Sequence, residues 1–250
     1  MAKPLIVGNW KAYVESLKEA KKLFKDIDAR LPRGASADIV VCPPTPFLAE
    51  LAAGYRGRRI AFGAQDVSVD AGAATGAVTP TMLKDAGASY VIVGHAERRA
   101  AGDTDEIVAR KAAAVRAAGL IPIVCVGESA RDPEGAHFAV LEQNVAASLA
   151  RLAPGDAPRI VIAYDPLWAI GQSAAPDPSV IREAAIFIRK TLAGMWGRER
   201  ALKVRVIYGG SVDGANADVI MRGAQVQGVL PGRASTDAEA FADIVRGFSQ

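Results

Sequence analysis

The chain has 250 residues, of which 50% are hydrophobic and 23% are charged, and this composition excludes an intrinsically disordered chain. Lysine and arginine number 30 against 27 aspartate and glutamate residues, and no long basic run occurs, so nucleic-acid binding is not predicted. No apolar run reaches the length of a membrane span, and the first residues lack a signal-peptide pattern. We therefore expect a globular protein of the cytoplasm with no membrane contact.

Short, apolar, β-branched runs recur along the chain and predict eight strands, at residues 5–10, 37–42, 59–64, 90–94, 120–127, 159–164, 203–210 and 226–232. Stretches with helical spacing of apolar residues lie between them, most clearly at residues 14–31, 103–119, 177–196 and 237–248. Strands that read as continuous apolar runs are buried on both faces, which indicates a parallel sheet.

Eight strand–helix units in a chain of this length match a closed (β/α)8 barrel of the α/β class, and no linker divides residues 1–250 into separate domains. An open, doubly wound sheet is the alternative, but no Gly-x-Gly-x-x-Gly pattern follows the first strand. Residues 65–80 form a long connection without a helical pattern, which is either a plain surface loop or a functional one.

The two cysteines, Cys42 and Cys125, each lie in an apolar run and form no Cys-x-x-Cys pair. They are interpreted as buried, reduced thiols of the core, and no metal or redox centre is predicted. His137 lies in a polar, helical stretch far from any strand end, and we expect it to be structural.

Polar residues and glycines follow several of the predicted strands, where a (β/α)8 barrel places its active site. They are Asn9, Lys11, His95, Glu97, Asp165, Gly209, Gly210, Ser211, Gly232 and Arg233. Taken singly, Lys11 could be a solvated lysine and His95 a structural histidine, so their joint position at one rim carries the prediction.

This set of residue types fits proton transfer beside a carbonyl group on a phosphorylated substrate. Backbone N–H groups at glycine-rich turns can approach a phosphate, and the loops after strands seven and eight are its usual site in such barrels. A carboxylate at Asp165 could take a proton from carbon, while His95 and Lys11 stabilise the resulting oxyanion. A lid that excludes water would then limit the loss of phosphate from the intermediate.

Five segments resemble the triosephosphate isomerases, and each follows its expected strand: GNWK (8–11), GHAERR (94–99), CVGE (125–128), PLWAIG (166–171) and YGGSV (208–212). The resemblance covers essentially the whole chain and implies the TIM barrel fold. It also implies a cofactor-free enzyme of glycolysis and gluconeogenesis that interconverts dihydroxyacetone phosphate and glyceraldehyde 3-phosphate.

The resemblance further implies a role for each site residue. Asp165 would be the base, His95 a neutral electrophile, Lys11 and Asn9 ligands of the substrate oxygen, and Glu97 a partner of Lys11 or a proton relay. The phosphate would be held by Gly171, Ser211, Gly232 and the N–H of Arg233. The closing lid would include Pro166, Leu167, Trp168, Ala169, Ile170, Gly171 and Pro176. A homodimer would form through residues 65–80, with Thr75 and Gly76 at the tip of the loop.

Three departures from the family pattern matter. Asp165 stands where the family has glutamate; the missing methylene retracts the carboxylate by about 1 Å, which can cost about 10²-fold in rate, or about 2.7 kcal/mol of barrier. In the family, the tyrosine at the position of Tyr208 holds the closed lid through a backbone N–H at the far hinge of the lid. Pro176 stands at that hinge and has no N–H, so this contact cannot form here. Arg233 replaces a glycine, where a positive φ would be costly, and its side chain could enter or rim the site.

Three functions therefore stay open at this point. The first is a triosephosphate isomerase, slowed by its shorter base. The second is an isomerase of a larger ketose phosphate, such as a tetrulose phosphate, because the shorter acid leaves room and Arg233 could contact an added hydroxyl. The third is a sugar-phosphate-binding paralogue with little catalysis.

Overall fold

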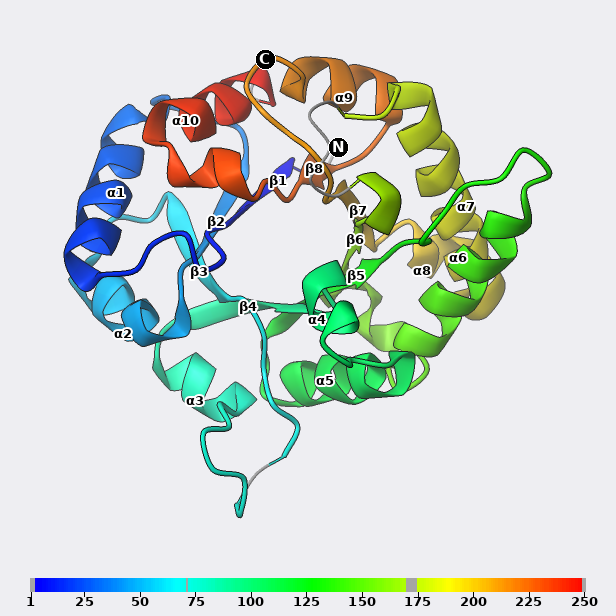
Figure 1. Cartoon of the computed structure of the whole chain (residues 1–250), viewed down its shortest axis with the longest axis horizontal. Coiled ribbons are helices and arrows are strands. Elements are labelled where there is room, and N and C mark those ends of the chain that lie inside the picture. Colours follow the sequence, from blue (N-terminus) through cyan, green and yellow to red (C-terminus); the bar gives the residue numbers. More distant parts are fainter. Residues whose placement is uncertain (1–2, 71, 170–174, 249–250) are drawn as a thin grey trace.

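The computed structural model describes residues 3–70, 72–169 and 175–248. Within these residues, eight parallel strands close into a barrel in chain order, and helices surround it (Figure 1). The strands are β1 (Leu5–Asn9), β2 (Asp38–Cys42), β3 (Ile60–Ala64), β4 (Ala88–Val93), β5 (Ile121–Val126), β6 (Val161–Tyr164), β7 (Arg205–Tyr208) and β8 (Gly228–Val229). The predicted (β/α)8 barrel is confirmed.

The helices begin where the sequence offers caps. Ser16, Thr104 and Asp237 each accept a hydrogen bond from a backbone N–H in the first turn of the helix that follows. The α-helices are α1 (Leu17–Arg30), α2 (Thr45–Gly54), α3 (Pro80–Asp85), α4 (Ala96–Ala100), α5 (Asp105–Ala117), α6 (Ala136–Ser148), α7 (Pro178–Trp196), α8 (Arg198–Ala201), α9 (Ala217–Ala224) and α10 (Ala238–Gly247). Short 3-10 helices are η1 (Pro154–Arg159), η2 (Leu167–Ala169) and η3 (Arg233–Thr236).

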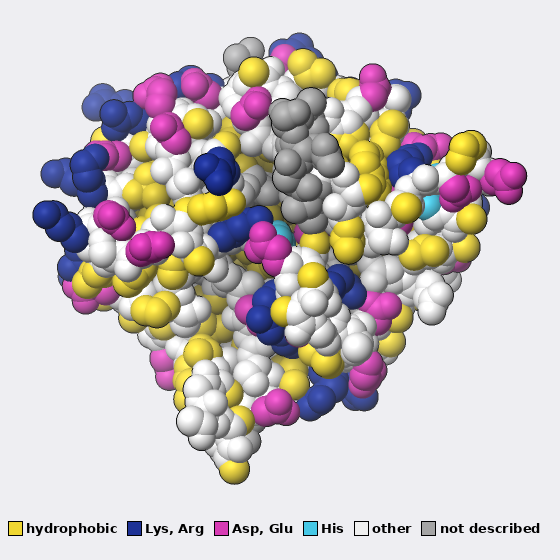
Figure 2. All heavy atoms as spheres, viewed as in Figure 1, with side chains coloured by type: hydrophobic (Ala, Val, Ile, Leu, Met, Phe, Trp, Pro, Cys, Tyr) yellow, Lys and Arg dark blue, Asp and Glu magenta, His cyan; other side chains and the backbone are white. Residues whose placement is uncertain are grey.

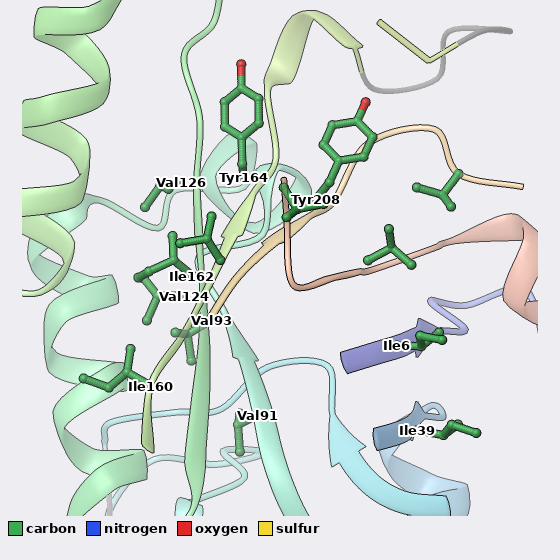
Figure 3. Close-up of a cluster of buried hydrophobic side chains, with 14 of the residues drawn as sticks. Ile6, Ile39, Val91, Val93, Val124, Val126, Ile160, Ile162, Tyr164 and Tyr208 are labelled. Atoms are coloured by element: carbon green, nitrogen blue, oxygen red, sulfur yellow. The ribbon is translucent and has the colours of Figure 1, made fainter. Parts of the chain in front are cut away.

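Alternation along the strands separates two apolar layers. Side chains inside the barrel pack on one another and include Leu5, Val7, Val40, Cys42, Ile92, Ile123, Cys125, Val161 and Ile207. Side chains on the outer face pack against the helices, and Figure 3 shows part of this layer, including Ile6, Ile39, Val91, Val124 and Ile162. Cys42 and Cys125 are buried and form no disulfide, as predicted.

The eighth strand is shorter than the predicted 226–232. Only Gly228 and Val229 have strand geometry, although backbone hydrogen bonds between neighbouring strands continue on either side, at Gln227 and Leu230. A Cβ atom on Gly228 would lie 1.9 Å from the carbonyl oxygen of Leu5, so this strand approaches β1 more closely than a side chain would allow. None of the helices in the described ranges is both long enough and apolar enough to cross a membrane.

Candidate active site

The predicted site residues converge at the C-terminal ends of the strands. A cavity of about 580 Å³ opens there, and its walls include Lys11, His95, Glu97, Asp165, Gly209, Gly210, Ser211, Gly232 and Arg233. Figure 2 shows basic, acidic and histidine side chains adjoining at the centre of this face of the barrel. The strands thus bring together residues that are far apart in the sequence.

Asp165 follows β6 directly and is only 2% exposed. Its Oδ2 atom accepts a hydrogen bond of 3.1 Å from the Ala96 N–H and lies 3.7 Å from His95 Nε2. Its Oδ1 atom is buried without a hydrogen-bond partner among the described residues. Burial raises the pKa of Asp165, although His95, the Ala96 N–H and Lys11 oppose the shift. A desolvated carboxylate with an unused oxygen is suited to accept a proton.

His95 caps the start of α4, which fixes the orientation of its ring. Its Nδ1 atom accepts a hydrogen bond of 3.2 Å from the Glu97 N–H, so Nδ1 carries no proton in this arrangement. A neutral ring then carries its proton on Nε2, the nitrogen that faces Asp165. That N–H can donate to a substrate oxygen.

Lys11 has an unusual backbone conformation for a residue other than glycine, with φ of +46°. Its N–H donates to Asn9 Oδ1 at 3.1 Å, and its carbonyl oxygen accepts from Gln65 Nε2 at 2.9 Å. The ammonium group lies 2.6 Å from Glu97 Oε1. Partial burial of Glu97 acts to raise the pKa of its carboxyl group. The hydrogen bond and the charge of Lys11 outweigh this effect, so the pKa of Glu97 is lowered. Sequence reasoning missed Gln65, whose position directly after β3 was the available signal.

The glycines after β7 and β8 are required by close approaches. A Cβ atom on Gly209 would lie 3.3 Å from Asp165 Oδ1, and one on Gly210 would lie 2.1 Å from the Tyr208 hydroxyl oxygen. A Cβ atom on Gly232 would lie 3.3 Å from Lys11 Cε. The two turns therefore bring backbone beside the side chains of Asp165 and Lys11, where N–H groups can meet an anion.

Arg233 begins η3 at the rim of the cavity. The non-glycine residues with positive φ in the described ranges are Lys11 and Gln225, so the predicted backbone strain at Arg233 is wrong. Its guanidinium carbon lies 5.0 Å from the centroid of the Tyr13 ring. Tyr13 also lines the cavity and was not singled out from the sequence, because no local pattern predicts this contact.

The predicted lid is described only in part, since Ile170 and Gly171 lie outside the described residues. Trp168 Nε1 donates to Glu128 Oε1 at 2.9 Å, and the Tyr164 hydroxyl donates to the same oxygen at 2.7 Å. Pro166, Leu167 and Ala169 continue from β6, and the Leu167 N–H donates to the Glu128 carbonyl oxygen at 3.0 Å. Glu128, 1% exposed, thus anchors the first part of the segment.

The far end of this segment and the tip of the long loop lie apart from these contacts. Pro176 precedes Asp177, which caps α7. The Tyr208 hydroxyl is buried beside the backbone of Ser211, and the loss of a lid latch at Pro176 stays a prediction. Thr75 and Gly76 are exposed on the loop between β3 and α3, which projects beyond the ring of helices (Figure 1).

His137 makes a contact within the fold and does not line the active-site cavity. His137 is buried in α6 and its Nδ1 atom lies 3.2 Å from Asp132 Oδ2, which is a structural contact. In the described ranges no three His, Cys, Asp or Glu side chains are grouped so that they could hold a metal ion.

Comparison with known proteins places the chain in one family. The triosephosphate isomerase family model matches residues 4–248. A triosephosphate isomerase of Carboxydothermus hydrogenoformans is 42% identical over 250 residues, which cover 99% of this chain and 99% of the relative. One of Chloroflexus aurantiacus is 43% identical over 245 residues, covering 97% of this chain and 98% of the relative. The chain therefore belongs to the triosephosphate isomerase family.

Proposed function

We propose that this enzyme interconverts dihydroxyacetone phosphate and glyceraldehyde 3-phosphate through an enediolate, with Asp165 as the base. The observation that carries the proposal is the convergence of Asp165, His95 and Lys11 on one cavity beside two glycine turns. Family membership supports the same substrates, because the relatives are named triosephosphate isomerases.

The chemistry needs one proton moved between neighbouring carbons. The glycine turns at 209–211 and 232–233, with Gly171, hold the phosphate. Asp165 takes a proton from the carbon beside the carbonyl group, and the C–H electron pair moves to make the enediolate. His95 Nε2–H and the Lys11 ammonium stabilise the oxygen that gains negative charge. A proton then moves from the hydroxyl oxygen on the first carbon to the former carbonyl oxygen, with His95 Nε2 as the relay, and Asp165 returns its proton to the adjacent carbon, which completes the isomerisation.

The remaining expectations extend this proposal. Residues 1–250 would act as one domain without a cofactor, and the enzyme would be a homodimer that meets its partner through residues 65–80. Figure 2 supports that surface, because the tip of the projecting loop shows mainly apolar and uncharged side chains. A location in the cytoplasm stays a prediction.

The length of the acid provides the experiment. Asp165→Glu is expected to raise kcat on triose phosphates by about 10²-fold, because the carboxylate regains its reach. Asp165→Asn, which keeps an oxygen for the Ala96 N–H, is expected to lower kcat by about 10³-fold. Both are measured by coupled isomerase assay, with exchange of substrate C–H in deuterated water as a check that needs no coupling enzyme.

Two results would contradict the proposal. A higher kcat/KM for a tetrulose phosphate than for the triose phosphates, with a loss on Asp165→Glu, would indicate a pocket built for the larger ketose. Phosphate binding without any C–H exchange would indicate a binding protein. Among the described residues, no contact favours either alternative over the triose reaction.

A further inference from the structure

The proposed reaction uses the backbone N–H of Arg233 but gives no role to the Arg233 and Tyr13 side chains. Both residues line the active-site cavity, and the guanidinium carbon of Arg233 lies 5.0 Å from the Tyr13 ring centroid. A guanidinium at this distance from an aromatic face is attracted to it. Tyr13 is 48% exposed and Arg233 is exposed, so the pair stands at the solvent rim of the cavity.

The other charged side chains that line the cavity do not neutralise the Arg233 guanidinium. The Lys11 ammonium is paired with Glu97 at 2.6 Å. Asp213, another carboxylate in the cavity wall, accepts hydrogen bonds from the N–H groups of Ala215 and Asn216, both at 2.9 Å. Within the described ranges no carboxylate lies within ion-pair distance of Arg233. Its positive charge is therefore available to an anion in the cavity.

The position of the preceding residue places this charge beside the phosphate turns. Gly232 lies against Lys11 Cε, and Ser235 donates its hydroxyl to the Gly232 carbonyl oxygen at 2.6 Å, which holds the turn in place. The cavity wall continues from this turn to Gly210 and Ser211. An anion held by the backbone N–H groups of both turns would therefore lie next to the first residue of η3.

We propose that the Arg233 guanidinium, held against Tyr13, binds the phosphate group of the substrate directly. This inference rests on the proposed function and adds a charged side-chain ligand to a site otherwise built from backbone N–H groups. A planar guanidinium can donate two parallel hydrogen bonds to a phosphate, which an ammonium cannot. Contact with the Tyr13 ring limits the rotamers of Arg233, so less conformational entropy is lost when phosphate binds.

Binding of simple phosphates tests this inference without turnover. By isothermal calorimetry, Arg233→Gln is expected to weaken binding of inorganic phosphate and of glycerol 3-phosphate by about tenfold. Arg58→Gln is the matched control, because Arg58 is an exposed arginine in the loop before β3, at the opposite end of the barrel, and its loss changes the net charge equally. The control is expected to match the unmodified enzyme.

Two further variants separate charge from geometry. Arg233→Lys keeps the charge but loses the planar donor pair, so an intermediate affinity is expected. Tyr13→Leu keeps Arg233 but removes the ring that positions it, and a smaller loss than that of Arg233→Gln is expected. Far-ultraviolet circular dichroism checks that each variant is folded.

Kinetics should show a uniform binding effect. The phosphate takes no part in bond making, so we expect Arg233 to bind it equally in the ground and transition states. Arg233→Gln should then raise KM for triose phosphates about tenfold and change kcat less than about twofold. The slow isomerisation of unphosphorylated glyceraldehyde should not change. The fall in kcat/KM with added salt should be shallower in Arg233→Gln than in the unmodified enzyme, because an exposed charge pair is screened.

The inference is overturned if Arg233→Gln and Arg58→Gln bind phosphate equally. It is also overturned if Arg233→Gln keeps its phosphate affinity and loses activity only on a tetrulose phosphate, since the guanidinium would then contact the other end of the substrate. Weakened phosphate binding in Arg233→Gln, together with an unmodified protein that isomerises no triose phosphate, would uphold this inference and refute the proposed function.

Discussion

Asp165 combines two features that are rarely found together in a structural carboxylate. It is 2% exposed, and only one of its two oxygens has a hydrogen-bond partner among the described residues. Burial raises the pKa of the group, because the charged form loses its hydration. An unpaired buried oxygen costs stability in the folded protein, and it is the atom that a proton from the substrate would reach.

Burying the charged carboxylate of Asp165 should destabilise the folded protein. A substitution that removes the charge should therefore increase stability, by an amount that depends on pH. The folded protein binds a proton at Asp165 more readily than the unfolded chain, so stability falls as the pH rises from the unfolded pKa through the raised folded pKa. Asp165→Asn should therefore have the higher Tm at pH 8, by about 2–4 °C for each kcal/mol gained.

That difference should shrink when both proteins are measured near pH 4, where Asp165 takes up its proton. Differential scanning calorimetry of the two proteins at both pH values makes the comparison. Equal Tm values at pH 8 would show that the buried charge costs nothing, and a difference that grows in acid would reverse the sign of the linkage.

At the scale of the elements, ionic side chains tie the loops at the rim to one another. Arg99 of α4 donates to the carbonyl oxygens of Gly94 and Cys125, at 2.9 and 3.0 Å, and to Asp105 at 2.6 Å. Lys111 of α5 lies 2.7 Å from Asp66 and 2.6 Å from Asp103. These contacts join the ends of β3, β4 and β5 and so hold His95 in position relative to the cavity.

The Lys111 contacts should be important for stability because they are buried. The side chains of Lys111 and Asp103 are 6% and 7% exposed, so Lys111→Met leaves carboxylates in a low-dielectric environment with less compensation. We expect a loss of about 3 kcal/mol in the free energy of unfolding, measured by urea titration.

Lys203→Met serves as the control for this loss. Lys203 pairs with Glu199 at 2.9 Å, but both side chains are open to solvent at 50% and 87%, so no measurable change is expected. Similar losses in the two variants would show that burial of the Lys111 cluster contributes nothing.

The sequence predicted the elements better than their contacts. Apolar runs located all eight strands, because burial on both faces of a parallel strand leaves a continuous pattern. Strand β6 begins at Val161 rather than 159, since Pro154 and Pro158 place the preceding residues in η1.

The side-chain partners could not be predicted from the sequence in the same way. The bonds of Glu128 to Tyr164 and Trp168, and the packing of Arg233 on Tyr13, join residues that no local period relates. The residues of the candidate site could be predicted because each follows the end of a strand. The residues that contact them could not, because they lie on whichever element the closed barrel brings near. The strain predicted at Arg233 failed because the turn enters η3 there instead of adopting a positive φ.

At the scale of the whole molecule, the projecting loop is the feature that a single barrel does not explain. The loop between β3 and α3 extends beyond the helices, and its exposed tip includes Thr75 and Gly76 (Figure 1). A second cavity, of about 450 Å³, lies at the base of this loop, between it and the loops and helices that carry Thr45, Arg98 and Lys111. Such a long exposed loop is suited to an interface with a partner.

The predicted homodimer can be tested at the tip of the loop. Thr75→Arg adds a large charged side chain where a partner would pack, and we expect the dimer to dissociate to monomer at micromolar concentration in sedimentation velocity. Val219→Arg is the control, because Val219 is 55% exposed on α9, across the barrel from the loop. The prediction is wrong if the Thr75→Arg protein sediments as the unmodified protein does, or if the control dissociates as well.

The backbone of Lys11 has a consequence for anyone who would move this chemistry to another scaffold. Its left-handed conformation persists because Asn9 Oδ1 accepts its N–H and Gln65, which follows a different strand, donates to its carbonyl oxygen. A graft that copied only the ammonium, imidazole and carboxylate would let that peptide relax and swing the cation aside. A design that transfers this site should therefore include the ends of both strands, together with the side-chain amides of Asn9 and Gln65.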